Sequence, residues 1–199
     1  MKIKHDLNKQ ERERIFQLRY EVCIGEFGWV IDKHAFVCHD KKVLCDPLDE
    51  TGLLFGAFLN NRSIGTCLAN YAHESDLEYY LKLYNVNKIT HGYNEAVSIS
   101  TKLIVDKHYR QGSVAFRMLL AMYLKGLSDG IKYNFIDCDP GMVSFFYRLG
   151  CSVHEPAIAR PDSNNAVVMV LELENEKILK ARGSPLYKSF MQYSRNSNV

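Results

Sequence analysis

The stretch from residue 95 to residue 150 constrains the fold more than any other part of the chain. "EAVSISTKLIVD" (95–106) is rich in β-branched residues and predicts a strand, and an amphipathic helix over 114–128 follows it after a short turn. That helix leads into a predicted strand, "KYNFIDCD" (132–139), and a second helix, "PGMVSFFYRLG" (140–150). Strands that alternate with helices in this way predict an α/β domain with helices packed on a sheet.

The flanking segments extend this α/β sandwich, and the sheet is expected to be mixed. We expect one domain over residues 1–180 and a polar, loosely held C-terminal tail over 181–199. About 25 irregular residues are expected between the first helix and the first hairpin. The other predicted elements are a helix over 8–22 capped by Asn8 or Asp6, a β-hairpin over 52–71 that turns at Asn60-Asn61, a helix over 75–86, and strands over 151–155 and 166–174.

The composition fits one globular domain. The chain has 199 residues, of which 47% are hydrophobic, so it can bury a sizeable core. Its 25 basic and 23 acidic residues leave a net charge of +2, which argues against a general nucleic-acid binder. No apolar run reaches the roughly 18 residues of a membrane span, and the charged start "MKIKHDLNKQERER" has no signal-peptide core. We therefore expect a soluble, cytoplasmic protein that binds no nucleic acid and spans no membrane.

The cysteines are spread along the chain and mostly lie in apolar surroundings, which is typical of reduced, packed thiols. One segment, "HAFVCHDKKVLC", brings together His34, Cys38, His39 and Cys45. A structural zinc site needs four converging ligands, and this segment has no Cys-x-x-Cys pair. We expect no metal.

The turn before the central helix, Arg110-Gln111-Gly112-Ser113, allows two interpretations. The first N–H groups of a helix lack internal partners and carry partial positive charge, so they can bind a phosphate that a glycine allows to approach. Alternatively, Ser113 caps the helix and Gly112 only makes the turn. The turn by itself favours the cap.

Two groups of motifs resemble a known superfamily and favour the phosphate. "VDKHYRQGSVAFRMLLAMYLKGLSDGIKYNFI", followed by "FFYRLG", resembles the donor half of the GNAT N-acyltransferases, in which an Arg/Gln-x-x-Gly-x-Gly/Ala turn cradles a pyrophosphate. The glycine of the turn stands one place early here. "RYEVCIGEFGW" and "CDPLDE" are similar to motifs of acyl-homoserine-lactone synthases and N-acyl amino acid synthases. The matching positions are Arg19, Trp29, Asp46 and Asp49, with Cys23 in place of the usual Phe.

The resemblance implies a fold and a donor. The expected fold is a GNAT-like mixed, largely antiparallel central sheet flanked by helices. The expected donor is acyl-CoA or the acyl-phosphopantetheine of an acyl carrier protein, and it binds without a metal. The donor-binding residues implied are Leu103, Ile104, Val105, Arg110, Gln111, Gly112, Ser113, Val114 and Ala115.

The implied reaction is the attack of an amine on a thioester, which needs a neutral nitrogen and donors for the oxyanion. A backbone N–H between Lys102 and Ile104 is the expected donor. Ile99 stands where lactone synthases have a glutamate. Glu95, on the same face of a regular strand, is therefore the candidate base, and Ser100 could orient a water. Alternatively, Glu95 is a solvated charge at the strand end.

The acid of the family is also replaced. Phe146 stands at the position of the usual tyrosine, and Tyr147 is next to it. Either Tyr147 acts as the acid, or none is needed because a thiol with a pKa of about 8.5 leaves as a thiolate.

The N-terminal motifs are candidates for acceptor binding. Arg19 could bind an acceptor carboxylate with two hydrogen bonds, or it forms a surface ion pair with Glu21 or Asp49. Asp46 and Asp49 could bind an ammonium group, or they are solvated or capping residues. Trp29 could line an acyl pocket, or it belongs to the core.

Three function classes remain open. The first is an N-acyltransferase that moves an acyl group from an acyl-carrier-protein or acyl-CoA thioester to the amine of an amino acid or related small molecule. The others are an acetyl-CoA-dependent N-acetyltransferase and a catalytically inactive GNAT-like binding module. Four basic residues could contact an acidic acyl carrier protein or form a solvated cluster: Lys102, Lys107, Arg110 and Arg117.

Overall fold

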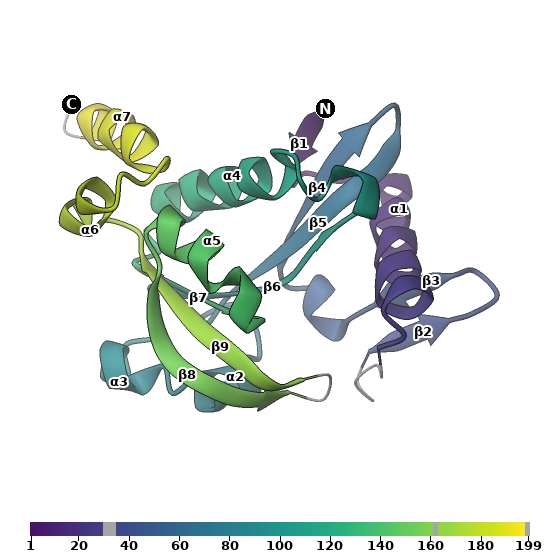
Figure 1. The fold of residues 1–199 in the computed structure, drawn as a ribbon, viewed down its shortest axis with the longest axis horizontal. Coiled ribbons are helices and arrows are strands. Elements are labelled where there is room, and N and C mark those ends of the chain that lie inside the picture. The colour runs from purple at the N-terminus through teal and green to yellow at the C-terminus, as the bar shows by residue number, and fades with distance from the viewer. Residues whose placement is uncertain (30–34, 161–162, 198–199) are drawn as a thin grey trace. The chain divides into compact units, whose positions relative to one another are not determined.

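Figure 1 shows a computed structural model of the chain, which describes residues 1–29, 35–160 and 163–197. The chain divides into two compact units. Unit 1 contains Met1–Asn70 and Ser100–Ala121, and unit 2 contains Tyr71–Ile99 and Met122–Val199. The predicted boundary at residue 180 stays a prediction.

Unit 1 begins with a helix that is capped as its sequence predicts. The Asn8 side chain accepts a hydrogen bond from the Glu11 amide at 3.0 Å, and the Glu11 carboxylate accepts one from the Asn8 amide at 3.1 Å, which is a capping box. The elements of unit 1 are β1 (Lys2–Lys4), α1 (Lys9–Tyr20), the π-helical turn η1 (Glu21–Glu26), β2 (Phe36–Cys38), β3 (Val43–Cys45), the 3₁₀ turns η2 (Pro47–Asp49) and η3 (Lys107–Tyr109), β4 (Leu53–Leu59), most of β5 (Arg62–Tyr71), and parts of β6 (Val97–Val105) and α4 (Val114–Ser128).

The segment expected to be irregular contains the strands β2 and β3 and the turn η2. β2 and β3 pair antiparallel from Phe36↔Cys45 to Cys38↔Val43. The prediction of an irregular segment was wrong here because strands of three residues are too short for an alternating pattern to be detected.

The hairpin β4–β5 matches its prediction. It turns at Asn60 and Asn61, whose φ angles of 48° and 62° suit a two-residue turn with the twist of a β-hairpin. Its two faces are covered within unit 1 by α1 and by the first half of α4. The cluster on the α1 side is Ile15, Leu54, Phe58 and Leu68, and the cluster on the α4 side is Ala57, Ile64, Val114 and Met118.

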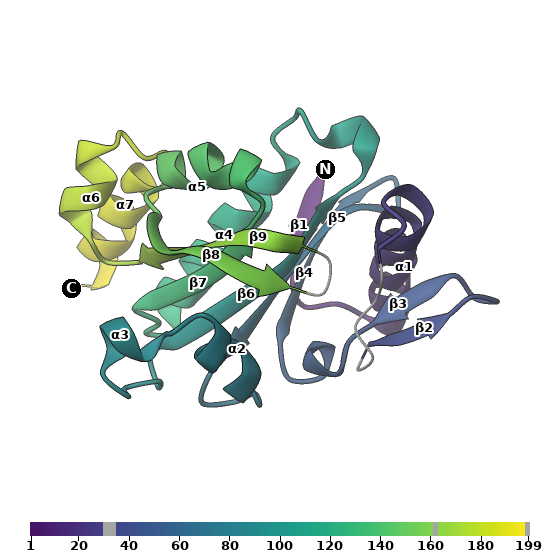
Figure 2. The same cartoon turned by 60° about the horizontal axis from the view of Figure 1, so that its bottom comes forward.

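Unit 2 is built around an antiparallel ladder. β7 and β9 pair without a register shift from Tyr133↔Glu172 to Cys138↔Val167. Figure 2 shows α5 on one face of this ladder and α2 and α3 on the other, where the Tyr84 hydroxyl donates to Asp137 at 2.7 Å. The elements of unit 2 are α2 (Glu78–Leu83), α3 (Asn87–Thr90), β7 (Tyr133–Cys138), the 3₁₀ turn η4 (Pro140–Met142), α5 (Val143–Leu149), β8 (Ser152–Arg160), β9 (Ser163–Glu172), α6 (Glu176–Ala181) and α7 (Tyr187–Ser197).

The segment predicted as a polar tail, residues 181–199, contains the whole of α7. Leu186 and Phe190 are buried, and the Tyr193 hydroxyl donates to the Leu127 carbonyl at 2.8 Å. The segment is polar in composition, but its few apolar residues recur at i and i+4 and form one buried stripe.

The strands form one seven-stranded sheet in the order β1-β4-β5-β6-β7-β9-β8, and β2 and β3 form a separate two-stranded sheet. The pairs β1–β4, β4–β5, β7–β9 and β8–β9 are antiparallel. The predicted fold class, a mixed and largely antiparallel sheet flanked by helices, is confirmed. No helix of the described residues is long and apolar enough to span a bilayer.

Candidate functional site

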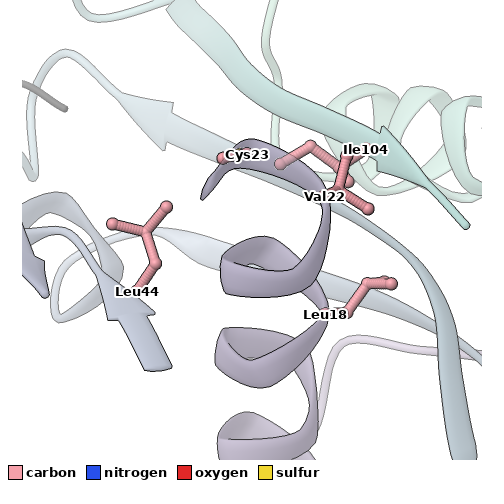
Figure 3. Packing of buried hydrophobic residues seen from close by; sticks show 5 residues of the cluster. All are labelled: Leu18, Val22, Cys23, Leu44 and Ile104. Atoms are coloured by element: carbon pink, nitrogen blue, oxygen red, sulfur yellow. The ribbon is translucent and has the colours of Figure 1, made fainter. Parts of the chain in front are cut away.

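Strand β6 departs from regular geometry at Lys102. The φ angle of Lys102 is +56°, in the left-handed region that a non-glycine residue rarely adopts within a strand. Such a residue bends the strand and turns neighbouring backbone groups out of the regular ladder, as in a β-bulge. Beyond it, Leu103 and Val105 pack towards α4, whereas Ile104 packs on Val22 of η1 (Figure 3). The strained residue therefore lies between two well-packed faces, which hold it in place.

The Lys102 side chain forms a half-buried ion pair. Its Nζ lies 2.8 Å from Asp46 Oδ2, and both side chains are 19% exposed. Asp46 also caps η2 by accepting from the Leu48 amide at 2.9 Å. Burial alone would raise the pKa of Asp46, but Lys102 and the Leu48 amide together lower it below its ordinary value. Lys102 is therefore committed to Asp46 and is not an exposed contact for a carrier protein.

Arg19 and Asp49 form a fully buried ion pair. Arg19 Nη1 donates to both carboxylate oxygens of Asp49, at 2.8 and 2.7 Å, and the two side chains are 0% and 1% exposed. Asp49 also accepts from the Asp46 amide at 2.8 Å, so the two ion pairs share the turn η2. The surface ion pair considered from the sequence has the right partner in Asp49 but lies in the interior. Arg19 Nε and Nη2 are buried, and neither has a hydrogen-bond partner among the described residues.

Three further buried polar groups of β5 and β6 lie in unit 1. The hydroxyls of Thr66 and Thr101 have no hydrogen-bond partner within the described ranges, and the Cys67 thiol donates weakly to the Thr101 carbonyl at 3.6 Å. Burial raises the pKa of Cys67 to about 12 against the opposing charges of Arg19 and Lys102. Sequence reasoning missed these groups, because threonine and cysteine are ordinary residues of a buried strand.

Trp29 belongs to an exposed aromatic pair and not to the core. It is 37% exposed, and its ring stacks on Phe27 with centroids 5.3 Å apart. Its amide donates to the Cys23 carbonyl at 2.8 Å, and the Phe27 amide donates to the Val22 carbonyl at 3.0 Å. These two hydrogen bonds tie the pair to the end of η1.

The predicted donor turn leads into α4 as expected. The Gly112 amide donates to the Tyr109 carbonyl at 3.1 Å, and the intrahelical bond from the Arg117 amide to the Ser113 carbonyl measures 2.9 Å. Gln111, Gly112 and Ser113 are exposed. The amides of the first helical turn precede that bond and have no intrahelical acceptor.

The start of α4 is held firmly against β5. Val114 is buried and Ala115 is half-buried. A Cβ added to Gly65 would meet Val114 Cγ1 and the Met118 methyl at 2.9 Å, so only glycine permits this close approach.

Arg110 does not point away from the protein. Its Nε donates to the Val105 carbonyl at 2.9 Å, and its Nη1 and Nη2 bind the two carboxylate oxygens of Glu26, the Nη2 bond measuring 2.7 Å. The guanidinium carbon also lies 5.0 Å from the centroid of the Phe27 ring. The hydrogen bond from Arg110 lowers the pKa of Glu26. Sequence reasoning missed this partner, which is 84 residues away.

No family model and no curated protein sequence matches this chain. Solved structures do match. A CoA-dependent acyl-homoserine lactone synthase, BjaI, superposes with a TM-score of 0.66 at 16% identity, covering 92% of this chain and 86% of that one. The chain has the GNAT fold. The AHL synthase LasI matches with a TM-score of 0.64 at 17% identity, covering 90% of each chain. FeeM, an N-acyl amino acid synthase from uncultured soil microbes, matches with a TM-score of 0.63 at 13% identity, covering 88% of this chain and 97% of that one.

The catalytic residues predicted from the GNAT resemblance are spread over both units. Ser100 is fully buried in the unit 1 part of β6. Glu95 is an exposed residue of unit 2 that precedes the first residue of β6, Val97, so it does not belong to the regular strand assumed for it. Tyr147 is a half-exposed residue of α5 whose ring lies 4.1 Å from the guanidinium of Arg182.

The predicted donor and acceptor residues of the GNAT fold belong to unit 1. In that unit the structure brings together Arg19, Asp46 and Asp49 with Lys102 through direct contacts. Among the described residues, no three His, Cys, Asp or Glu side chains are gathered as metal ligands. Of the four residues considered as zinc ligands, three belong to unit 1, namely Cys38, His39 and Cys45. The fourth, His34, falls outside the described residues.

Proposed function

We propose that this protein is an N-acyltransferase that moves an acyl group from an acyl-CoA or acyl-carrier-protein thioester to the amine of an amino acid or related small molecule. The observation that carries the proposal is the left-handed Lys102 within β6 of a GNAT fold. A bend of this kind leaves a backbone N–H able to donate to the oxyanion of a tetrahedral intermediate. The same strand leads through Arg110–Ser113 to the start of α4, whose amides suit the donor's phosphate.

The reaction needs a base more than an acid. The acceptor nitrogen forms a C–N bond with the thioester carbonyl carbon, loses one proton, and the C–S bond breaks. A thiol with a pKa of about 8.5 leaves readily as a thiolate. We propose Glu95, which is exposed, as the base that takes the proton through a water molecule, and Ser100 as a residue that orients a water. Tyr147 is then an optional acid.

The proposed acceptor carries a carboxylate as well as an amine. The Nε–Nη2 edge of Arg19 is the geometry that binds a carboxylate with two parallel hydrogen bonds, and Asp49 occupies only Nη1. Buried polar groups without partners are rare and call for an explanation. Asp46, which Lys102 helps to keep ionised, is the proposed partner of the acceptor amine before its proton is lost. Because Arg19 is fully buried, the side chains over its free edge must move when the acceptor enters.

A catalytically inactive binding module is the second candidate, and one observation favours it. Ile99, at the position where lactone synthases have a glutamate, is fully buried, so no charged group occupies that place in β6. Turnover distinguishes the two candidates directly, because a module would bind the donor without forming an amide.

The test is a screen of acyl-CoA and acyl-carrier donors of increasing chain length, including acetyl-CoA, against pooled amino acids, with products identified by mass. We expect an N-acyl amino acid from at least one donor. In the matched variant Arg110→Glu with Gly112→Val, donor affinity should fall at least about tenfold, because a charge-assisted contact and the close backbone approach are both lost. Coenzyme A binding without any product would favour the binding module. If wild-type protein neither binds nor reacts, the proposal is wrong.

A second variant tests the base. Glu95→Gln should lower turnover more than donor affinity, and unchanged turnover would reassign the proton to solvent alone. An acyl carrier protein would contact the exposed Lys107 and Arg117, so charge reversal at Arg117 should weaken a carrier donor more than the corresponding acyl-CoA. The cytoplasmic location stays a prediction.

A further inference from the structure

All three nitrogens of the Arg110 guanidinium are engaged in this structure. Nε donates to the Val105 carbonyl, and Nη1 and Nη2 bind the Glu26 carboxylate. Two of its five N–H groups remain, one on Nη1 and one on Nη2, and they point along different edges of the guanidinium. A phosphate at the donor turn can therefore bind two nitrogens of Arg110 at once only by displacing one of these partners. Val105 is backbone of β6 and cannot leave its place, so the partner that can leave is Glu26.

The ion pair of Arg110 and Glu26 is suited to exchange. The two side chains are 34% and 28% exposed, so solvent screens their attraction and can hydrate Glu26 once it is released. A phosphate offers the guanidinium the same two-oxygen fork as a carboxylate, and the pyrophosphate of coenzyme A carries two negative charges against the one of Glu26. The hydrogen bond from Nε to Val105 keeps the guanidinium beside the turn during such an exchange.

Glu26 is linked directly to the exposed aromatic pair. It is the last residue of η1, and Phe27 follows it in the chain, under the Arg110 guanidinium and stacked on Trp29. The base of η1 is fixed, because Val22 and Cys23 pack with Ile104 (Figure 3). Arg110 therefore holds the end of η1 and its aromatic pair, while the base is held by apolar packing.

We propose that Glu26 and the donor's phosphate compete for Arg110, so that donor binding releases Glu26 and the Phe27–Trp29 pair. The inference rests on the proposed function, because it assumes an anionic donor at this turn. Glu26 is then a positioning residue that fixes the aromatic pair in the donor-free protein. Trp29 is the single tryptophan of the chain, so its fluorescence reports the release directly.

The experiment titrates wild-type protein and three variants with free coenzyme A, following Trp29 emission and, separately, binding heat. Glu26→Gln removes the competing charge and should bind coenzyme A about threefold more tightly or better, as expected from the loss of one exposed ion pair. Arg110→Gln should bind at least about tenfold more weakly. Glu21→Gln is the matched control: it removes the same charge from the same turn, 3.9 Å from Arg62, and should leave the affinity unchanged.

Trp29 emission supplies the second readout. Coenzyme A should shift the emission of wild-type protein towards that of ligand-free Glu26→Gln, and it should shift that variant little. If Glu26→Gln and Glu26→Ala bind coenzyme A no more tightly than wild type, competition is ruled out while the donor site stands. If wild-type protein does not bind coenzyme A, the proposed donor site fails, and the exchange fails with it.

Discussion

Two arginines of unit 1 each bind both oxygens of a carboxylate, and they do so in opposite surroundings. Arg19 and Asp49 are 0% and 1% exposed, whereas Arg110 and Glu26 are 34% and 28% exposed. In the interior, removing one partner leaves an uncompensated charge without water, so the pair has to stay intact. At the surface, water and salt can replace either partner, so the pair can exchange. An arginine–carboxylate pair is therefore suited to a fixed structural role when it is buried, as for Arg19, and to an exchangeable contact when it is exposed, as for Arg110.

The largest expected effect on the free energy of unfolding comes from breaking the buried ion pair of Arg19 and Asp49. Asp49→Ala should lower the free energy of unfolding by about 3–5 kcal/mol, because Arg19 would remain buried and charged without its partner. The matched control is Glu50→Ala, one residue along, whose side chain is 82% exposed and lies 3.7 Å from Arg12. Urea unfolding at neutral pH gives the free energy of unfolding of both variants and of wild type. A loss as small as that of Glu50→Ala would mean that Arg19 is hydrated in solution.

The next largest expected effect on stability concerns the backbone conformation of Lys102 in β6. Lys102→Val and Lys102→Gly remove the same ion pair with Asp46, so their difference isolates the left-handed φ of this position. We expect Lys102→Val to be less stable than Lys102→Gly by about 2 kcal/mol, because a β-branched residue fits this region worst and glycine fits it best. Thermal or urea unfolding of the two variants checks this, and equal stabilities would contradict the bend in β6.

A smaller effect depends on pH. The pKa of Asp46 is lowered in the folded protein despite its burial, chiefly through Lys102, so its stabilising contribution is present above its unfolded pKa of about 4 and is lost as the pH falls through the lowered folded value. The deficit of Asp46→Asn relative to wild type should therefore be constant near pH 6 and shrink below about pH 4. Urea unfolding of both proteins across this range gives the answer, and a deficit that grows on acidification would reverse the assigned sign.

The smallest effect on stability belongs to the exposed pair. Arg110→Gln should change the free energy of unfolding by less than about 1 kcal/mol, although it should reduce donor affinity strongly. If this variant loses much stability, Arg110 is needed for folding in the same way as Arg19. That result would weaken the case that Arg110 exchanges Glu26 for a phosphate.

Local chemistry made much of the fold predictable. Asn8 has the capping box that its helix start suggested, and Asn60-Asn61 turn the hairpin because asparagine tolerates positive φ. The helix over 114–128 was predicted to the residue from its apolar stripe and the preceding turn. The short strands β2 and β3 were missed because they carry too few residues for a pattern.

The site was predictable only as a set of residue types. The resemblance to synthase motifs points to Arg19, Asp46 and Asp49, and the structure joins them with Lys102. The sequence could not show that Arg19 forms its ion pair with Asp49 in the interior, or that Arg110 forms an ion pair with Glu26. It also could not show the left-handed Lys102, because lysine has no intrinsic preference for that conformation.

By itself, the sequence determined the order of helices and strands and the positions of the caps and turns, because these depend on residues three or four positions apart. Only the tertiary structure decided which carboxylate each arginine binds, since Arg19 and Asp49 are 30 residues apart and Arg110 and Glu26 are 84 apart. It also decided how far each pair is removed from water. That burial, which no local pattern encodes, keeps the Arg19–Asp49 pair away from water and leaves the Arg110–Glu26 pair within reach of it.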